Sequence, residues 1–329
     1  MAVGKASDFK VYQEYLQTRM TEILTQNGTA FNQASNGAIV MTTQSKRGDY
    51  EYEAFFKSIS GLISRRNTAS TSPVPDLALT QDEFIRVKLN RKIGPVANTR
   101  DSFRKIMSRY SETEFTDIIA EQASVAQQLD MLNSVLLAGR AALVNYGSDV
   151  LYTIPSNGSL STVGLVNGLA KFGDRADRIV CWVMHSKAYY DLVKDQIAEN
   201  IDGVSNFNVR TGTPLTLNRP VVVTDSDALV VTSGSPATTT YYTLGLTANA
   251  LLAESTEEDD IVVDEVTGNE NLIVRIQGEY AFNAGVKGFK WDVGNGGANP
   301  SGAAIGTGSN WDIAVSSKKD LAGVVIASA

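Results

Sequence analysis

The chain has 329 residues, of which 43% are hydrophobic and 20% are charged, so it can bury the core of one large domain or two smaller ones. No apolar run reaches the roughly 18 residues of a membrane helix, and residues 1–12 lack the hydrophobic stretch of a signal peptide. We therefore expect a soluble protein that is made in a cytoplasm, without membrane contact. The one cysteine, Cys181, excludes an internal disulfide framework.

The charge is distributed unevenly along the chain. Residues 1–110 carry 16 Lys and Arg against 10 Asp and Glu, a net of +6, whereas residues 111–329 carry 13 against 26, a net of −13. Such asymmetry is typical of a basic nucleic-acid arm or of two surfaces that attract each other. Because the basic residues alternate with apolar ones and form no dense run, we favour pairing between protein surfaces.

The N-terminal part predicts one helix and one strand. In residues 7–26 the apolar side chains recur on one stripe, which indicates an amphipathic helix. Ser7 or Asp8 is suited to cap its start, and Asn27-Gly28 is expected to end it. Residues 37–43 predict a short strand.

Two alternating segments, 48–53 and 83–93, predict an antiparallel ribbon. Paired, they set an acidic row against a basic row on one face, and cross-strand pairs of this kind contribute roughly 0.2–1 kcal/mol each. The other face is apolar except for Arg91. A short amphipathic stretch and a polar loop lie between the two segments. Since a two-stranded ribbon is marginal in water, we expect another part of the protein, or another copy, to cover its apolar face.

Residues 111–146 predict one long helix. Ser111 and Glu114 form a capping box at its start, and Gly147 is expected to end it. At about 1.5 Å per residue the helix would be on the order of 50 Å long. Its predicted core stripe consists of Phe115, Ile118, Gln122, Val125, Leu129, Leu132, Leu136 and Leu143.

The remainder predicts a mixed α/β region. Ser186 is the expected N-cap of a helix that runs to about Glu199, and the turn Thr267-Gly268-Asn269 predicts a hairpin. A glycine-rich stretch covers residues 294–308, and its first part, residues 294–297, is expected to be a flexible surface connection. The expected strands are 179–184, 220–224, 241–247, 261–266, 272–282 and 286–293, followed by a final apolar segment, 311–326. The overall class is α+β.

The candidates for chemistry favour structural roles. His185 is the only histidine, so a Ser-His-Asp triad could use only this residue and a zinc site could draw only one imidazole, and we favour a structural role for it. Cys181 lies in an apolar strand and is expected to be an inert core thiol. The acidic cluster from Glu254 to Glu265 lacks the spacing of a calcium loop, so a solvated face or a subunit contact is favoured. We predict no catalytic residue, no metal ligand and no cofactor.

Four segments resemble the major capsid proteins of tailed bacteriophages: FNQASNGAIVMTT (31–43), ISRRN with LTQDEFIRVKLNRKIGPV (63–96), IVCWVMHSKAYYDLVKD (179–195) and RPVVVTDSDAL (219–229). The order of the predicted elements is also similar. The resemblance implies the Hong-Kong-97-type capsid fold. It assigns an N-terminal arm (1–45), an extended β-hairpin loop (46–100), a P-domain with a long spine helix (101–150), an A-domain (151–261), and a P-domain sheet with the C-terminus (262–329).

The resemblance also implies a function. It is that of a major capsid protein, not an enzyme, which self-assembles into pentamers and hexamers of an icosahedral phage head around double-stranded DNA. The implied location is the virion, after assembly in the host cytoplasm. The implied partners are other copies, a portal, and a scaffold or decoration protein, with only weak non-specific contact to DNA. Two alternatives stay open: an encapsulin-type nanocompartment shell, and a cytoplasmic α/β enzyme.

We expect contacts between subunits to be concentrated in the extended loop. Its aromatic residues would supply affinity, and its basic residues would set orientation by meeting acidic surface. The candidates are Tyr50, Tyr52, Phe55, Phe56, Arg65, Arg66, Arg86, Lys88, Arg91 and Lys92.

Overall fold

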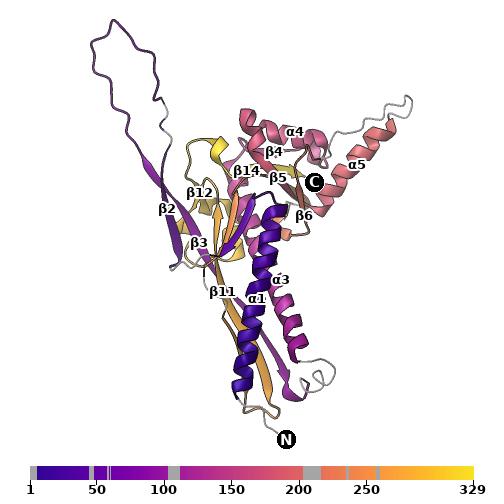
Figure 1. Ribbon diagram of the computed structural model, residues 1–329. Coiled ribbons are helices and arrows are strands. Elements are labelled where there is room, and N and C mark those ends of the chain that lie inside the picture. Colours follow the sequence, from indigo (N-terminus) through magenta and orange to yellow (C-terminus); the bar gives the residue numbers. More distant parts are fainter. Residues whose placement is uncertain are drawn as a thin grey trace.

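Two six-stranded sheets and one long helix organise the chain (Figure 1). The computed structural model describes residues 6–43, 48–57, 59, 61–102, 112–202, 216–234, 237–256 and 260–329. The first sheet contains β1 (Ile39–Thr43), β2 (Tyr50–Phe56), β3 (Gln81–Thr99), β9 (Leu251–Ser255), β10 (Asp260–Val266) and β11 (Ile273–Val286). Its order is β1-β9-β11-β3-β2, and β10 pairs with the start of β11.

The second sheet has the order β4-β14-β8-β5-β6, with β7 paired to β8. Its strands are β4 (Leu151–Thr153), β5 (Ile179–His185), β6 (Val221–Thr224), β7 (Val230–Ser233), β8 (Thr238–Thr247) and β14 (Gly323–Ser328). Helices α4 (Thr162–Ala170) and α5 (Ser186–Asp202) pack beside it. The mixture of separate helices and mainly antiparallel sheets confirms the predicted α+β class.

Helix α1 (Ala6–Ala34) is longer than predicted. Gly28 does not end it, because Gly28 is buried where the helix passes close to Met41 of β1. The helix ends instead at Asn36 and Gly37, whose φ angles of 53° and 69° turn the chain into β1. The side chains of the predicted caps, Ser7 and Asp8, lie outside the described residues.

Helix α3 (Glu112–Tyr146) confirms the predicted long helix and contacts α1 and both sheets. In its second half, Leu132, Leu136 and Leu143 are buried, as predicted. The predicted core stripe is wrong in the first half, where Ile118, Val125 and Leu129 are exposed. There the helix faces α1 and β10 with small or polar buried residues, including Ala120, Ser124 and Gln127, because close helix packing needs little side-chain volume. Ser111 and the side chains of Glu114 and Phe115 lie outside the described residues.

The predicted ribbon forms as β2 paired with β3, with Glu51 opposite Arg86. Ile85, Val87 and Leu89 turn to one face and are buried in the main core with α3. The body of the same chain therefore covers the apolar face of β3. Residues 61–66, within the predicted amphipathic stretch, form no helix.

The glycine-rich stretch does not contain the flexible connection that was predicted at residues 294–297. It forms two short helices, α6 (Val293–Gly296) and α7 (Gly302–Ile305), that lie between β12 (Phe289–Trp291) and β13 (Trp311–Ile313). Trp291 and Trp311 are buried edge to face, with ring centroids 5.0 Å apart. A Cβ at Gly308 would come within 2.6 Å of Asn145 Cβ on α3. These glycines therefore serve close packing, not mobility.

Sheet membership crosses the predicted domain boundaries at two strands. β9, placed by sequence in the A-domain segment 151–261, pairs with β1 and β11 of the first sheet. β14, placed in the segment 262–329, pairs with β4 and β8 of the second sheet. The domain boundaries themselves stay a prediction.

Candidate functional site

A long loop projects from the body of the molecule between β2 and β3 (Figure 1). We call its described residues 57, 59 and 61–80 the arm loop. Every residue from 61 to 80 is exposed. Five of these are large apolar residues: Leu62, Ile63, Val74, Leu77 and Leu79. The side chain of Ile63 is 94% exposed. Exposed apolar side chains that occur together are a common feature of interaction surfaces.

The root of the arm loop is fixed by Asp82. Its carboxylate accepts bonds from the Nζ of Lys57 at 2.6 Å and the Nζ of Lys290 at 3.1 Å. Partial burial by itself raises the pKa of Asp82, but the bonds from Lys57 and from the backbone N–H of Glu83 outweigh it. Together with the bond from Lys290 they lower this pKa to about 2. Two ion pairs therefore hold the base of the loop to β12 and to its own first residue.

The four aromatic contact candidates on β2 differ in how far they are exposed. Tyr52 and Phe56 are exposed, whereas Tyr50 is partly buried against the main core. The ring of Phe55 stacks on Phe84, with centroids 4.2 Å apart. Tyr52 and Phe56 are therefore free to contact another molecule, while Tyr50 and Phe55 are already in contact within the chain.

The basic contact candidates also fall into two groups. Arg65 and Arg66 in the arm loop and Lys92 on β3 are exposed. Lys88 is 4% exposed. Arg91 Nε donates to Asp130 Oδ2 on α3 at 3.0 Å, and Tyr280 donates to the same oxygen at 2.8 Å. Arg91 thus ties the first sheet to α3.

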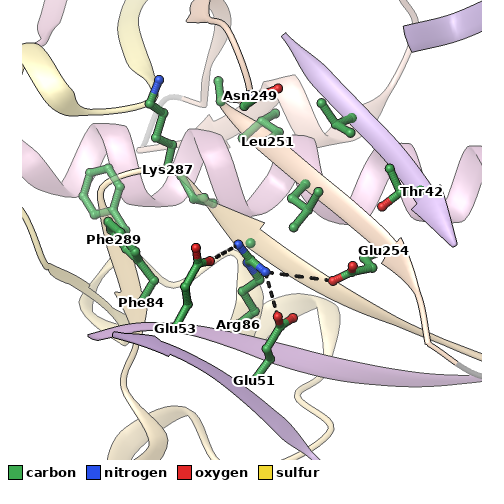
Figure 2. A pocket seen from close by; sticks show the side chains of 15 residues that line it. Thr42, Glu51, Glu53, Phe84, Arg86, Asn249, Leu251, Glu254, Lys287 and Phe289 are labelled. Atoms are coloured by element: carbon green, nitrogen blue, oxygen red, sulfur yellow. Dashed lines mark hydrogen bonds and ion pairs between the residues drawn. The ribbon is translucent and has the colours of Figure 1, made fainter. Parts of the chain in front are cut away.

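Arg86 lies among three carboxylates in a pocket of about 600 Å³ (Figure 2). Its Nη1 is 2.9 Å from Glu51 Oε1 and 3.9 Å from Glu254 Oε2, and its Nη2 is 2.5 Å from Glu53 Oε2. Glu51 and Glu53 come from β2, and Glu254 comes from β9. We call this site the carboxylate pocket; it lies on the face of the first sheet opposite α3. The predicted acidic and basic rows thus meet here, within one chain.

Arg86 reaches from β3 to β9 because the intervening residue on β11 is Gly285. A Cβ at this position would stand 3.0 Å from Arg86 Cγ and 3.1 Å from its Cδ. Those distances are tighter than ordinary van der Waals contact, so an alanine would push the guanidinium group away from Glu254. The absence of a side chain at Gly285 is therefore part of the site.

Sequence reasoning missed several of these residues. The alternation of β2 pointed to Glu51 and Glu53, and the acidic cluster contained Glu254, but nothing local indicated that they meet. No signal marked Asp82 or Gly285. Residues 257–259 of the acidic cluster lie outside the described residues.

The remaining candidates have structural roles. His185 Nδ1 accepts the backbone N–H of Lys187 at 3.1 Å, so this imidazole, and not Ser186 as predicted, caps α5. Burial raises the pKa of the Cys181 thiol to about 11, which keeps it protonated. In the described part of the chain, no group of three His, Cys, Asp or Glu residues could hold a metal ion. The helices described here also lack an apolar stretch of the length that a membrane span requires.

Comparison with protein families decides the relationship. The family described as Gp13-like, major capsid protein 13-like, matches residues 8–325. The chain belongs to this family. It is therefore a major capsid protein of a tailed-phage head and a component of the virion, in a family of structural shell proteins. No match is found among curated proteins.

Solved phage structures show the same fold as this capsid protein. A chain from the capsid of Myoviridae phage XM1 is 12% identical and has a TM-score of 0.51, with 89% of this chain and 90% of that chain covered. A chain from Mycobacterium phage Adephagia is 11% identical, with a TM-score of 0.51 and coverage of 90% and 89%. A chain from Mycobacterium phage Cain is 12% identical, with a TM-score of 0.50 and coverage of 86% and 89%. The Hong-Kong-97-type capsid fold is thus confirmed.

Proposed function

We propose that copies of this capsid protein associate through the arm loop into pentamers and hexamers, which close into an icosahedral head around double-stranded DNA. The observation that carries the proposal is the exposure of residues 61–80 with five large apolar side chains. Burial of one such side chain contributes about 1.5–3 kcal/mol. Repeated in every copy around a closed ring, such contacts favour a finite shell.

The division into an N-terminal arm, extended loop, P-domain and A-domain is part of this proposal. In it, the exposed Tyr52 and Phe56 at the base of the arm loop also meet the adjacent subunit. Arg65, Arg66 and Lys92 contribute orientation more than affinity, because exposed ion pairs are worth about 0–1 kcal/mol each. Lys88, Arg86 and Arg91 act mainly within the subunit, since the first is buried and the other two are ion-paired in it.

A closed head that is filled with DNA requires further partners. A portal occupies one opening, and a scaffold or decoration protein acts during assembly or on the finished shell. Contact with DNA is weak and non-specific, because the chain carries a net charge of −7 and packaged DNA must leave again.

The decisive experiment replaces residues 58–79 with Asn-Gly, so that Lys57 and Thr80, already joined by a backbone hydrogen bond of 2.9 Å, flank a two-residue turn. We expect a folded subunit, by circular dichroism and thermal melting, that forms no shells in electron micrographs. Intact shells from this variant would contradict the role of the arm loop.

The comparisons favour a phage head over an encapsulin-type nanocompartment, because the chain is similar to phage structures and to a capsid family. A neighbouring gene for a portal or a terminase would support this choice. A neighbouring gene for a cargo enzyme would oppose it.

A further inference from the structure

The carboxylate pocket contains more negative than positive charge. Glu51, Glu53 and Glu254 surround the single guanidinium group of Arg86, which gives these four groups a net charge of −2. Lys88, buried on the same face of β3, brings the net to −1 when it is counted. The third cation of the region, Lys287, directs its Nζ to the carbonyl oxygen of Ala248 at 2.9 Å, away from the carboxylates (Figure 2).

The pocket is open at Glu53 and closed at Glu254. The side chain of Glu53 is 57% exposed, whereas that of Glu254 is 3% exposed. A cation that enters would therefore meet Glu53 first. The pocket walls include Val40, Leu252 and Phe84, so an apolar side chain next to the cation would also find contacts.

The arm loop carries the matching chemistry. Arg65 and Arg66 are exposed and form no ion pair with the described residues, and Leu62 and Ile63 precede them by two to four positions. The arm loop points away from the body of its own chain (Figure 1), so its arginines do not occupy their own pocket. An arginine suits this site better than a lysine, because its planar fork binds a carboxylate through two bonds.

We infer that the carboxylate pocket receives an arginine of the Arg65-Arg66 pair from the arm loop of a second copy of this chain. The inference rests on the proposed assembly through the arm loop and names the surface that accepts it. Glu53 provides the first contact for the arriving guanidinium group, and Arg86 holds Glu51 and Glu254 in place behind it. Leu62 and Ile63 then cover the apolar wall of the pocket.

A disulfide cross-link tests this contact directly. One variant carries Arg66→Cys and another carries Glu53→Cys, both with Cys181→Ser, and an equivalent pair uses Arg65→Cys. Mixed and assembled under reducing conditions, then oxidised, the two variants should give a covalent dimer on a non-reducing gel. Glu83→Cys is the matched control, because Glu83 is an exposed acidic residue on the opposite face of the same ribbon. The Glu83→Cys variant should give at least tenfold less covalent dimer than the Glu53→Cys variant.

The outcomes separate the inference from the proposed function. Shells that form without a cross-link from Glu53→Cys to either arginine position would overturn the pocket contact while leaving assembly through the arm loop intact. A chain that carries both substitutions and forms the disulfide within one molecule would also overturn the inference, because the arm loop would then fill the pocket of its own chain. If cysteine variants do not assemble, a charge exchange decides. Arg65→Glu with Arg66→Glu should lower shell yield at least tenfold, and added Glu53→Arg should recover it; no recovery contradicts the inference.

Discussion

The second half of α3 and the arm loop differ in how completely the chain covers its own apolar side chains. Leu136 and Leu143 are fully buried between the two sheets, whereas Ile63 and Val74 are almost fully exposed. Both regions contain several large aliphatic residues, so the presence of such residues does not by itself decide which region is covered. The buried part stabilises the subunit of this capsid protein, and the exposed part is the surface that we propose for contact with a second copy.

Substitution in the covered region should have the largest effect on the subunit. Phe282 of β11 is fully buried against the main core, so Phe282→Ala removes many contacts and leaves a cavity. We expect the free energy of unfolding to fall by about 3–5 kcal/mol, measured by urea denaturation of unassembled subunits. A loss below about 1 kcal/mol would mean that this region is much less tightly packed than the structure indicates.

The glycine-rich stretch gives the next largest effect. Gly308→Ala places a Cβ 2.6 Å from Asn145 Cβ and 2.9 Å from the Ala141 carbonyl oxygen. Because two backbones must move apart, we expect a loss of about 1–3 kcal/mol in the same denaturation experiment. Gly302→Ala is the control, since nothing lies within 4 Å of its added Cβ. Equal stability of the two variants would contradict the close packing of Gly308 against α3.

The same comparison explains what the sequence could and could not predict. Alternation along β3 correctly predicted that Ile85, Val87 and Leu89 share a buried face, because a strand's two-residue period is local. The helical period of α3 correctly predicted its length. It failed for Ile118, Val125 and Leu129, because the side of a helix that is covered depends on distant elements, here α1 and β10.

Most of the carboxylate pocket could not be predicted from the sequence. Glu51 and Arg86 were expected to face each other, because two neighbouring alternating segments pair as a ribbon. Glu254 joins them only because β9 pairs with β11, which in turn pairs with β3. Neither strand pairing can be recognised from the sequence around these residues. The role of Gly285 becomes apparent only in the structure, where the side chain of Arg86 passes over it.

A smaller effect is expected at the base of the arm loop, where the two regions meet. Asp82→Asn removes the carboxylate that holds Lys57 and Lys290, and should cost about 1–2 kcal/mol at neutral pH. The folded-state pKa of about 2 lies below the ordinary value of 3.8. The contribution is therefore fully present above about pH 4 and is lost as the pH falls through about 2.

Denaturation curves of the Asp82→Asn variant between pH 2 and pH 7 check this sign. The difference from the unsubstituted protein should shrink toward the acidic end. Asp76→Asn is the control, because Asp76 is an exposed carboxylate in the arm loop that forms no ion pair with the described residues. A pH-independent difference at Asp82 would show that its role is not electrostatic.

Substitutions in the arm loop are expected to have the smallest effect on the stability of the subunit and the largest effect on assembly. Ile63→Ser changes a side chain that is 94% exposed, so the free energy of unfolding should stay within about 0.5 kcal/mol of the unsubstituted protein. Shell yield, measured by sedimentation and electron microscopy, should nevertheless fall, because the apolar contact with the adjacent subunit is lost in every copy at once. Thr68→Ala, at an exposed polar position of the same loop, should assemble normally. If Ile63→Ser destabilises the isolated subunit and assembles as well as Thr68→Ala, the arm loop is stabilised by its own chain and the contrast with α3 disappears.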